Sequence, residues 1–206
     1  MNDSTVAQAV SKLQANQFDV SVVADAAAAL DKLRELIPNG SSVNTAGSTT
    51  LAEIGFNDLL KSGAHSWRNI KGEILAETDR TKQAALRRTT GLSVDVHVTS
   101  VSAIDAEIGA LHVCCMSGSR TGALLFGPAK VIVVVGKNKF VANVAEATAR
   151  IDEYCVPVES ARARIAYAAY GFERSYAYAR ASLSGQMMFG GQSRYHVIVV
   201  DQILGF

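Results

Sequence analysis

The sequence predicts an α/β fold, a Rossmann-like sheet covered by helices, from two observations. Residues 131–135 form an uninterrupted apolar run and residues 195–200 a second, largely apolar one, as expected for strands buried on both faces. Between such runs lie segments with the 3.6-residue apolar periodicity of helices. Alternating strands and helices are typical of an α/β sheet. Because no repeat or low-complexity linker interrupts the pattern, we expect one domain over residues 1–206.

The first half of the chain alternates helix and strand. Asp25 is expected to cap the helix that follows it, because its side chain suits the free backbone N–H groups of a first turn. Pro38-Asn39-Gly40 ends that helix with turn chemistry. Residues 94–98 alternate apolar and polar side chains, which favours a strand with one exposed face. The expected elements are helices at 5–14, 25–37, 49–60 and 77–88, and strands at 18–23, 42–46, 65–67 and 94–98.

The second half contains three short apolar runs that are predicted to be strands. Ser-Gly-Ser-Arg and Gly-Pro linkers favour turns between them, so the last two runs are expected to form a hairpin. The Arg- and Tyr-rich segment 161–180 contains side chains that stack on nucleic-acid bases, but apolar residues at helical spacing, from Ile165 to Leu183, favour a helix packed on the core. The expected elements are strands at 111–116, 122–126, 131–135 and 195–200, helices at 140–154 and 161–180, and a loop at 185–193.

Bulk composition gives no indication of a nucleic-acid or membrane partner. The chain of 206 residues is 49% apolar and has a formal net charge of +1, so neither a basic nor an acidic excess points to such a partner. Its start lacks the lysines and the long apolar run of a signal peptide. Its longest strongly apolar run is far too short to cross a bilayer. We therefore expect a cytoplasmic protein.

The cysteines and histidines predict neither a disulfide framework nor a metal site. Cys114, Cys115 and Cys155 form no C-x-x-C pair and fit small buried residues in a reducing compartment. The four histidines lack metal-ligand spacing, and His97 and His112 are expected on the solvent-facing sides of strands. No metal ion or cofactor is predicted.

The stretch NTAGSTTLAE is the first candidate binding site. A strand leads into Gly47, after which Ser48, Thr49 and Thr50 open a helix. The free backbone N–H groups of a helix start, together with hydroxyl groups, suit a phosphate or a carboxylate. The alternative is that Thr50 is simply an N-cap, with Glu53 reaching back to complete a capping box.

The turn Gly136-Lys137-Asn138-Lys139 is the second candidate. It is not a Walker A loop, because no Ser or Thr follows Lys137, but it lies between a buried strand and a helix. That edge of an open α/β sheet is where ligands bind, and two lysines there would steady an anion, although they equally fit solvated charge at a strand end. Arg120, in the turn between the predicted strands at 111–116 and 122–126, is either a bidentate anion clamp or an exposed turn residue.

Several motifs occur together in the order of a known family. The block GSRTGALLFGPAKVIVVVGKNK contains a Gly-x-Arg hairpin, a Gly-Pro turn, a valine-rich strand and a Gly-x-Asn-Lys turn, and GSTTLAEIG precedes it. These features, with the closing VIVVDQILGF, resemble the LUD-domain family, the lactate-utilisation proteins. The resemblance spans most of residues 42–206. The chain departs from it in three ways: the hairpin asparagine of the family is Ser119 here, no acidic residue stands in the few positions before it, and no cysteine follows Cys155, where many relatives carry a cysteine cluster.

The resemblance implies a fold of the kind shared with ribose-5-phosphate isomerase, glucosamine-phosphate isomerase and coenzyme A transferases. In the sugar-phosphate isomerases a Gly-Ser-Thr turn at a helix start holds phosphate, which by analogy of fold favours residues 47–50 as an anion site. Family members are associated with bacterial lactate oxidation beside iron–sulfur partner proteins. Iron or zinc bound by the family's cysteine cluster is not expected in this chain.

The expected function is that of a non-redox accessory or ligand-binding component of bacterial lactate or organic-acid utilisation. It binds a small anionic metabolite, and iron–sulfur proteins are candidate partners by resemblance. The predicted site combines residues 47–50, Arg120 and residues 136–139. An alternative is an enzyme that acts on a phosphorylated or thioester small molecule, with Glu53 as general base or nucleophile. A third function, a structural assembly partner, would have no small-molecule site.

Overall fold

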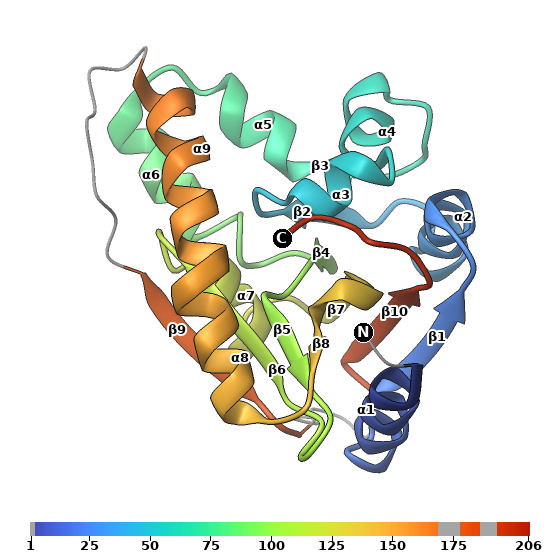
Figure 1. Cartoon of the computed structure of the whole chain (residues 1–206). Helices are drawn as coiled ribbons and strands as arrows, with labels where there is room; N and C mark the ends of the chain where they lie inside the picture. Colours follow the sequence, from blue (N-terminus) through green and yellow to red (C-terminus); the bar gives the residue numbers. More distant parts are fainter. Residues whose placement is uncertain (1–2, 169–177, 186–192) are drawn as a thin grey trace.

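The apolar run at residues 131–135 lies within strand β7, in the middle of a six-stranded parallel sheet (Figure 1). This computed structural model describes residues 3–168, 178–185 and 193–206. β10 pairs with one edge of β7 and β4 with the other, and residues 131–136 are all buried. The α/β class and the buried central strand are therefore confirmed. The strand order is β1 (Asp19–Val23), β10 (Tyr195–Val200), β7 (Lys130–Gly136), β4 (Val96–Thr99), β2 (Ser42–Thr45) and β3 (Arg68–Asn69).

A second, four-stranded sheet packs against one face of the first. Its order is β8 (Phe140–Val141), β5 (Ala103–Asp105), β6 (Leu111–Cys115) and β9 (Ala179–Leu183). β5 and β9 pair antiparallel with β6, and β8 pairs parallel with β5. Ile104 and Leu111 of this sheet share a buried core with Val133 of β7 and with the first helix. The predicted strand at 111–116 is thus confirmed, in a layer that the sequence did not indicate.

Helices cover the other face of the parallel sheet. Leu33, Leu51 and Phe56, from three of these helices, form a buried core with Ile132 of β7. The helices of the described chain, on both faces, are α1 (Asp3–Ala15), α2 (Ala26–Leu36), α3 (Thr49–Glu53), α4 (Phe56–Ser62), α5 (Ile70–Ala76), α6 (Arg80–Arg88), α7 (Ser119–Leu125), α8 (Val144–Arg150) and α9 (Val156–Ala168), with a 3₁₀ turn at Lys137–Lys139 and a π-helical turn at Ile151–Cys155. No helix in the described part of the chain is long and apolar enough to cross a membrane.

The predicted strand at 122–126 is wrong, because these residues belong to helix α7. Gly118 has a φ of 76° in the left-handed region, which lets the chain turn and begin a helix at once. Ala123 and Leu124 are fully buried, whereas Phe126 is 69% exposed. A four-residue apolar run fits a buried helical turn as well as a strand, so its pattern alone did not distinguish the two. The predicted hairpin is therefore a strand–helix–strand connection from β6 to β7.

Other helix boundaries differ from the predictions where local caps decide them. Asp25 caps α2 as predicted, accepting a hydrogen bond from Ala28 N at 2.8 Å. The predicted helix at 49–60 is split at Gly55, which has a φ of 78°. The predicted helix at 140–154 begins instead after its cap, Asn143. The short strand expected at 65–67 forms at Arg68–Asn69, and α5, which follows it, was not predicted.

His97 and His112 are buried, which corrects their expected exposure. Only 2% of His97 and 5% of His112 is accessible. Alternation along a strand predicts which side chains share a face, but not whether another layer covers that face. His112 lies inside the second sheet and bonds to Asp105 Oδ2 at 2.7 Å. His97 lines a cavity that opens where β2 and β4 end.

The segment predicted as one core helix over 161–180, with Leu183 on its apolar face, is only partly helical. Helix α9 is described over Val156–Ala168, and its Ile165 is 80% exposed rather than packed on the core. Leu183 is buried, but within strand β9. Residues 169–177, and residues 186–192 of the predicted loop at 185–193, lie outside the described residues.

Candidate functional site

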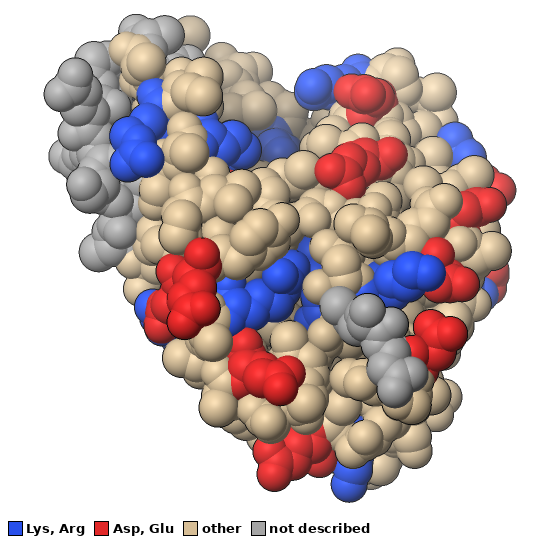
Figure 2. Space-filling model, in the orientation of Figure 1, with Lys and Arg blue, Asp and Glu red and all other residues tan. Residues whose placement is uncertain are grey.

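A cavity of about 530 Å³ opens where β2 and β4 end. Gly47, which follows β2, and Ser100, which follows β4, form one side of it. The other walls come from α5, α6, α7 and α9. Figure 2 shows a hollow between the surface over α9 and the surface over α4, with Lys and Arg atoms in and beside it. The carboxyl ends of parallel strands are the usual ligand-binding edge of an open α/β sheet, so the cavity lies where ligands bind in this class of fold.

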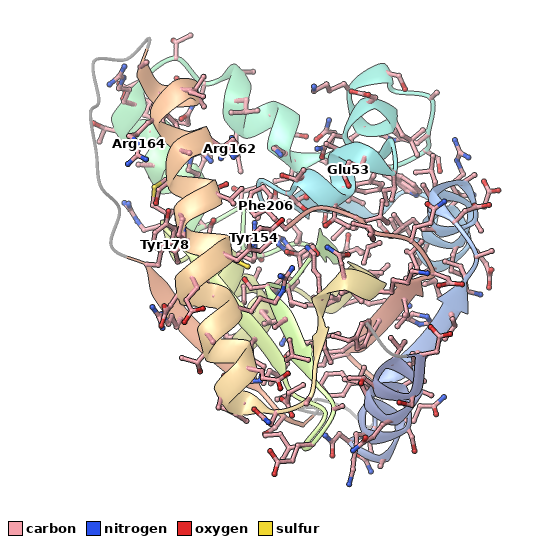
Figure 3. All side chains as sticks on the ribbon, viewed as in Figure 1. Glu53, Tyr154, Arg162, Arg164, Tyr178 and Phe206 are labelled. Carbon is pink, nitrogen blue, oxygen red and sulfur yellow. The ribbon has the colours of Figure 1, made fainter. Side chains whose placement is uncertain are left out.

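Cationic side chains dominate the lining of this cavity. Among the described lining residues, the cations are Lys71 of α5, Arg87 of α6, Arg120 of α7, Arg162 of α9 and Lys139, which lies in the 3₁₀ turn. The acidic side chain among them is Glu159. Arg162 binds Glu159 through two hydrogen bonds of 2.7 and 2.6 Å. Figure 3 shows that Arg162 points from α9 toward Phe206, whereas Arg164 points away. The other four cations face no acidic lining residue in the described chain, so the cavity has an excess of positive charge.

Lys139 is the most deeply buried of these cations, with 2% of it exposed. Its Nζ donates to three neutral oxygens: Thr50 Oγ1 at 2.9 Å, Ser100 Oγ at 3.1 Å and Val101 O at 3.2 Å. Burial, followed by the charge of Arg120, lowers the pKa of Lys139 to about 7. The amine therefore changes its charge near neutral pH, and an anion bound beside it would raise its pKa again.

Arg120 connects two of the segments that the sequence singled out. It lies in the first turn of α7, and its Nη2 donates a hydrogen bond to the carbonyl oxygen of Gly47. Its Nε is buried and has no hydrogen-bond partner among the described residues. The structure thus places Gly47 and Arg120 together, as the predicted site required, although Arg120 lies in a helix instead of a turn between strands.

Ser48, and not Thr50, caps helix α3. Ser48 Oγ accepts a hydrogen bond from Leu51 N at 3.2 Å, whereas Thr50 accepts the hydrogen bond from Lys139. The predicted capping box is wrong because the helix begins at Thr49, which moves the cap two residues before Thr50. Ser48, Thr49 and Thr50 all line the cavity. Since α3 has only five residues, their hydroxyl groups and the nearby cations outweigh its dipole.

Four of the predicted site residues hold the C-terminal segment instead of lining the cavity. Glu53 Oε2 accepts from Gly205 N at 2.6 Å, Lys137 Nζ bonds Asp201 Oδ1 at 2.7 Å, and Asn138 bonds Leu204 N at 3.0 Å and Gly205 O at 3.1 Å. Gly136 approaches the same segment so closely that a Cβ there would lie 2.7 Å from Leu204 N. We call Glu53, Gly136, Lys137 and Asn138 the C-terminal clamp. Of the predicted turn at 136–139, only Lys139 lines the cavity.

Sequence reasoning missed several residues of the cavity. Lys71, Arg87 and Arg162 come from three separate helices, and His97 was expected to face solvent. No motif relates these positions, because they meet only through the packing of the helices. The three cysteines also line the cavity and are free, as predicted. Among the described residues, no group of His, Cys, Asp and Glu side chains is placed to hold a metal ion.

Cys115 differs from the other cavity cysteines in its electrostatic surroundings. Burial alone would raise the pKa of its thiol, but the backbone N–H and the charge of Arg120, with the N–H groups of Ser117 and Thr121, lower it overall. Burial instead raises the pKa of Cys155. Because the thiolate is the reactive form of cysteine, Cys115 forms that species more readily than Cys155 does.

Buried polar atoms without partners gather around this cavity. Asn57 Oδ1, both ring nitrogens of His97 and Arg120 Nε are buried and unpaired within the described part of the chain. All three residues line the cavity. Buried polar atoms in folded proteins are nearly always hydrogen-bonded. Their arrangement therefore suits a polar occupant.

Comparison with known proteins agrees with this architecture. A DUF162 family protein from Deinococcus radiodurans is similar in fold, with a TM-score of 0.52 and 15% sequence identity over 96% of this chain and 97% of that one. At this identity the likeness concerns the fold alone. No curated protein matches the chain significantly. The family model of the LUD domain matches residues 6–200. Since that match covers nearly the whole sequence, the chain belongs to the LUD-domain family.

Proposed function

We propose that this LUD-domain protein binds a small organic anion in the cavity, as a ligand-binding or accessory component of bacterial lactate or organic-acid utilisation. The excess of cationic side chains in the cavity lining is the observation that supports anion binding. Membership of the LUD-domain family supports the metabolic role. Association with iron–sulfur proteins is part of the same proposal, and co-purification with such proteins tests it.

Lys71 illustrates why the cavity favours an anion. It has no hydrogen-bond or ion-pair partner among the described residues. Burial, followed by the charges of Lys61 and Arg87, lowers its pKa, so its ammonium group is held in a place that disfavours positive charge. A carboxylate or phosphate would compensate that charge, in surroundings where ion pairs are stronger than in water.

The cations are arranged at different depths, which suits capture followed by binding. Lys139 lies deepest, and Arg120 and Lys71 are partly buried. Arg87 is exposed, where its charge attracts an approaching anion, whereas the exposed Arg162 is paired with Glu159. Arg120 provides the planar donor group that binds carboxylate or phosphate through paired hydrogen bonds. We expect the anion to lie between Arg120, Lys71 and Lys139.

Titration calorimetry with lactate, other small organic acids and inorganic phosphate tests the proposal. We expect Arg120→Ala and Lys71→Met each to weaken binding about tenfold or more, since each removes a charge that contacts the anion. Lys137→Ala and Arg164→Ala are matched controls, because neither side chain lines the cavity. Failure of every anion to bind the native protein, or equal losses in variants and controls, would count against it. Thermal unfolding of each variant verifies that it is folded.

An enzyme acting on a phosphorylated or thioester small molecule is the second candidate, and Lys139 favours it. A group whose pKa lies near 7 transfers protons efficiently at neutral pH, and such groups are concentrated at functional sites. Glu53, the base expected from the sequence, is bound to Gly205 and does not line the cavity. A turnover assay with such substrates should lose its signal in Lys139→Met and keep it in Glu53→Gln. Loss of turnover in Glu53→Gln, with turnover kept in Lys139→Met, would instead identify Glu53 as the catalytic base.

A further inference from the structure

Asp105, His112 and Ser182 form a chain of hydrogen bonds in the second sheet. His112 Nε2 lies 2.7 Å from Asp105 Oδ2, and His112 Nδ1 lies 2.8 Å from Ser182 Oγ. None of these three residues lines the cavity. A carboxylate, an imidazole and a hydroxyl group bonded in this order are the groups with which serine hydrolases activate their nucleophile. The three side chains therefore have the contacts of a nucleophile, its base and a group that orients the base.

The second sheet fixes the positions of all three groups. His112 of β6 and Ser182 of β9 lie directly opposite each other in an antiparallel pair, so their side chains share one face. Asp105 ends β5, the neighbour of β6 on its other side. Its Oδ1 accepts from Ile108 N at 2.8 Å and its Oδ2 from Ala110 N at 3.2 Å. The turn between β5 and β6 thus holds the carboxylate beside the ring.

These contacts determine which nitrogen of the ring carries the hydrogen. The oxygens of the Asp105 carboxylate only accept hydrogen bonds, so in the neutral ring His112 Nε2 is the donor. His112 Nδ1 is then left with its lone pair, and the hydroxyl hydrogen of Ser182 points at it. A hydroxyl group that donates to an imidazole nitrogen has the contact through which a general base removes its proton.

Exposure to solvent differs along this chain of groups. Asp105 is fully buried and His112 is 5% exposed, whereas Ser182 is exposed. In the described chain β9 is the edge strand of its sheet and pairs only with β6 (Figure 1). The pair of Asp105 and His112 alone would serve to hold the turn between β5 and β6. The contact with Ser182 adds a hydroxyl group that a dissolved compound can reach, with its base shielded behind it.

We propose that Ser182 is a nucleophilic serine that takes acyl groups from carboxylic esters, with His112 as its base and Asp105 orienting the ring. Ser182 Oγ bonds to the carbonyl carbon of the ester, and the bond from that carbon to the alcohol oxygen breaks. The hydroxyl proton passes to His112 Nδ1 and from there to the departing alcohol oxygen. This site shares no residue with the cavity, so the inference is independent of anion binding.

Water completes the reaction by the same route in reverse. The water oxygen bonds to the acyl carbon, and the bond from that carbon to Ser182 Oγ breaks. One proton of the water passes through His112 to Ser182 Oγ, which restores the hydroxyl group and releases a carboxylic acid. The overall reaction is the hydrolysis of an ester and needs no further reactant.

Acetylation of the full chain by p-nitrophenyl acetate, located by peptide mass spectrometry, tests this inference. We expect an acetyl group on Ser182 and release of p-nitrophenol. Ser182→Ala should abolish acetylation at this position, and His112→Gln should slow it about a hundredfold, a usual contribution of a general base. Ser184→Ala is the matched control, because Ser184 is also exposed and lies two residues away. Peptide mapping separates these serines from lysines and cysteines, which also react with the ester.

Asp105→Asn tests the orienting role. Its amide nitrogen donates to His112 Nε2, so the hydrogen of the ring moves to Nδ1 and the base faces away from Ser182. Acetylation of Ser182 should therefore slow as in His112→Gln. In the native protein the rate should rise with pH as the imidazole loses its proton, and in Asp105→Asn this dependence should disappear. A substitution that only loosened the turn would leave the pH dependence in place.

Three results would overturn the inference. The first is a native protein that acquires no acetyl group on Ser182. The second is acetylation of Ser182 no faster than that of Ser184, and the third is an unchanged rate at Ser182 in a folded His112→Gln variant. In the last two cases the hydroxyl group reacts without help from the ring. Thermal unfolding verifies that each variant is folded, and the comparison of Ser182 with Ser184 needs only the native protein.

Discussion

The cavity and the C-terminal clamp contain the same kinds of residues but use them differently. Lys137 and Lys139 are two residues apart, yet Lys137 pairs with Asp201 at the surface, whereas Lys139 is buried against neutral oxygens. In the clamp, each polar group is matched by a partner within the chain. In the cavity, Lys71 and the imidazole of His97 have none among the described residues. The difference fits the proposal that a ligand completes the cavity, whereas the clamp is complete on folding.

The largest expected effect is the pH dependence that Lys139 imposes on stability. Its pKa is about 7 in the folded protein and 10.5 ordinarily, so between these values the unfolded chain holds a proton that the folded chain releases. The stability of the native protein relative to Lys139→Met should therefore rise with pH, by at most about 1.4 kcal/mol per pH unit.

Urea unfolding of both proteins at pH 6, 7.5 and 9 measures this difference. Anion affinity of the native protein should change in the opposite direction, falling as pH rises through 7, because the neutral amine no longer attracts an anion. A stability difference that stays constant from pH 6 to 9 would show that Lys139 is not perturbed, and the contrast with Lys137 would disappear.

Substitution of Gly136 should have the next largest effect, confined to the clamp. A Cβ at this position would lie 2.7 Å from Leu204 N and 2.8 Å from Gln202 O, so the backbone of the C-terminal segment must shift. We expect Gly136→Ala to lower the free energy of unfolding by about 2 kcal/mol, measured by urea titration. Gly47→Ala is the control, because a Cβ there meets nothing within 4 Å. Equal losses in the two variants would contradict this account.

A smaller effect is expected from Glu53→Gln. The substitution replaces the charged acceptor of the Gly205 N–H by a neutral amide oxygen, at an exposed position. Stability should fall by about 1 kcal/mol, while the affinity for anions stays unchanged. Thermal unfolding and calorimetry measure the two quantities on the same sample. A large loss of anion affinity with unchanged stability would show that Glu53 acts in the anion site and not in the clamp.

The smallest effect is expected from Lys137→Ala. Its ion pair with Asp201 is solvent-exposed, with 39% and 65% of the two side chains accessible, and such pairs contribute little. At both low and moderate salt, the variant and the native protein should not differ measurably in their unfolding midpoint or in their affinity for anions. A clear loss of anion affinity in this variant would erase the distinction between the two lysines.

The sheet was the most predictable part of the molecule. Residues 131–135 and 195–200 show by their apolar composition alone that both faces are covered, and Asp25 marks the start of α2 through its own side chain. In both cases the information is local: a strand buried on both faces must be apolar, and a cap must carry an acceptor. The short run at 122–126 contains no such information, so α7 was assigned wrongly.

The candidate site was predictable only in outline. Gly47, Ser48, Thr49, Thr50 and Arg120 follow recognisable glycine turns, and the structure brings them together with Lys139. Lys71, Arg87, Arg162 and His97 were missed because their proximity depends on how α5, α6 and α9 pack over β4. The members of the clamp were assigned to the wrong region for the same reason. In the sequence, a glycine or lysine that follows a strand gives the same signal whether it faces a cavity or packs against a neighbouring segment.

The position of β10 has a consequence for biosynthesis. This last strand lies between β1 and β7, and its partners in β1 are far away in sequence, with Asp19 beside His196. While the chain is being made, β1 has no neighbour in this sheet until residues 195–200 have left the ribosome, and until then one edge of β7 is unpaired. Pairing over such a separation is slow and leaves strand edges open to aggregation. We therefore expect C-terminally truncated chains to depend on chaperones and to accumulate as insoluble material.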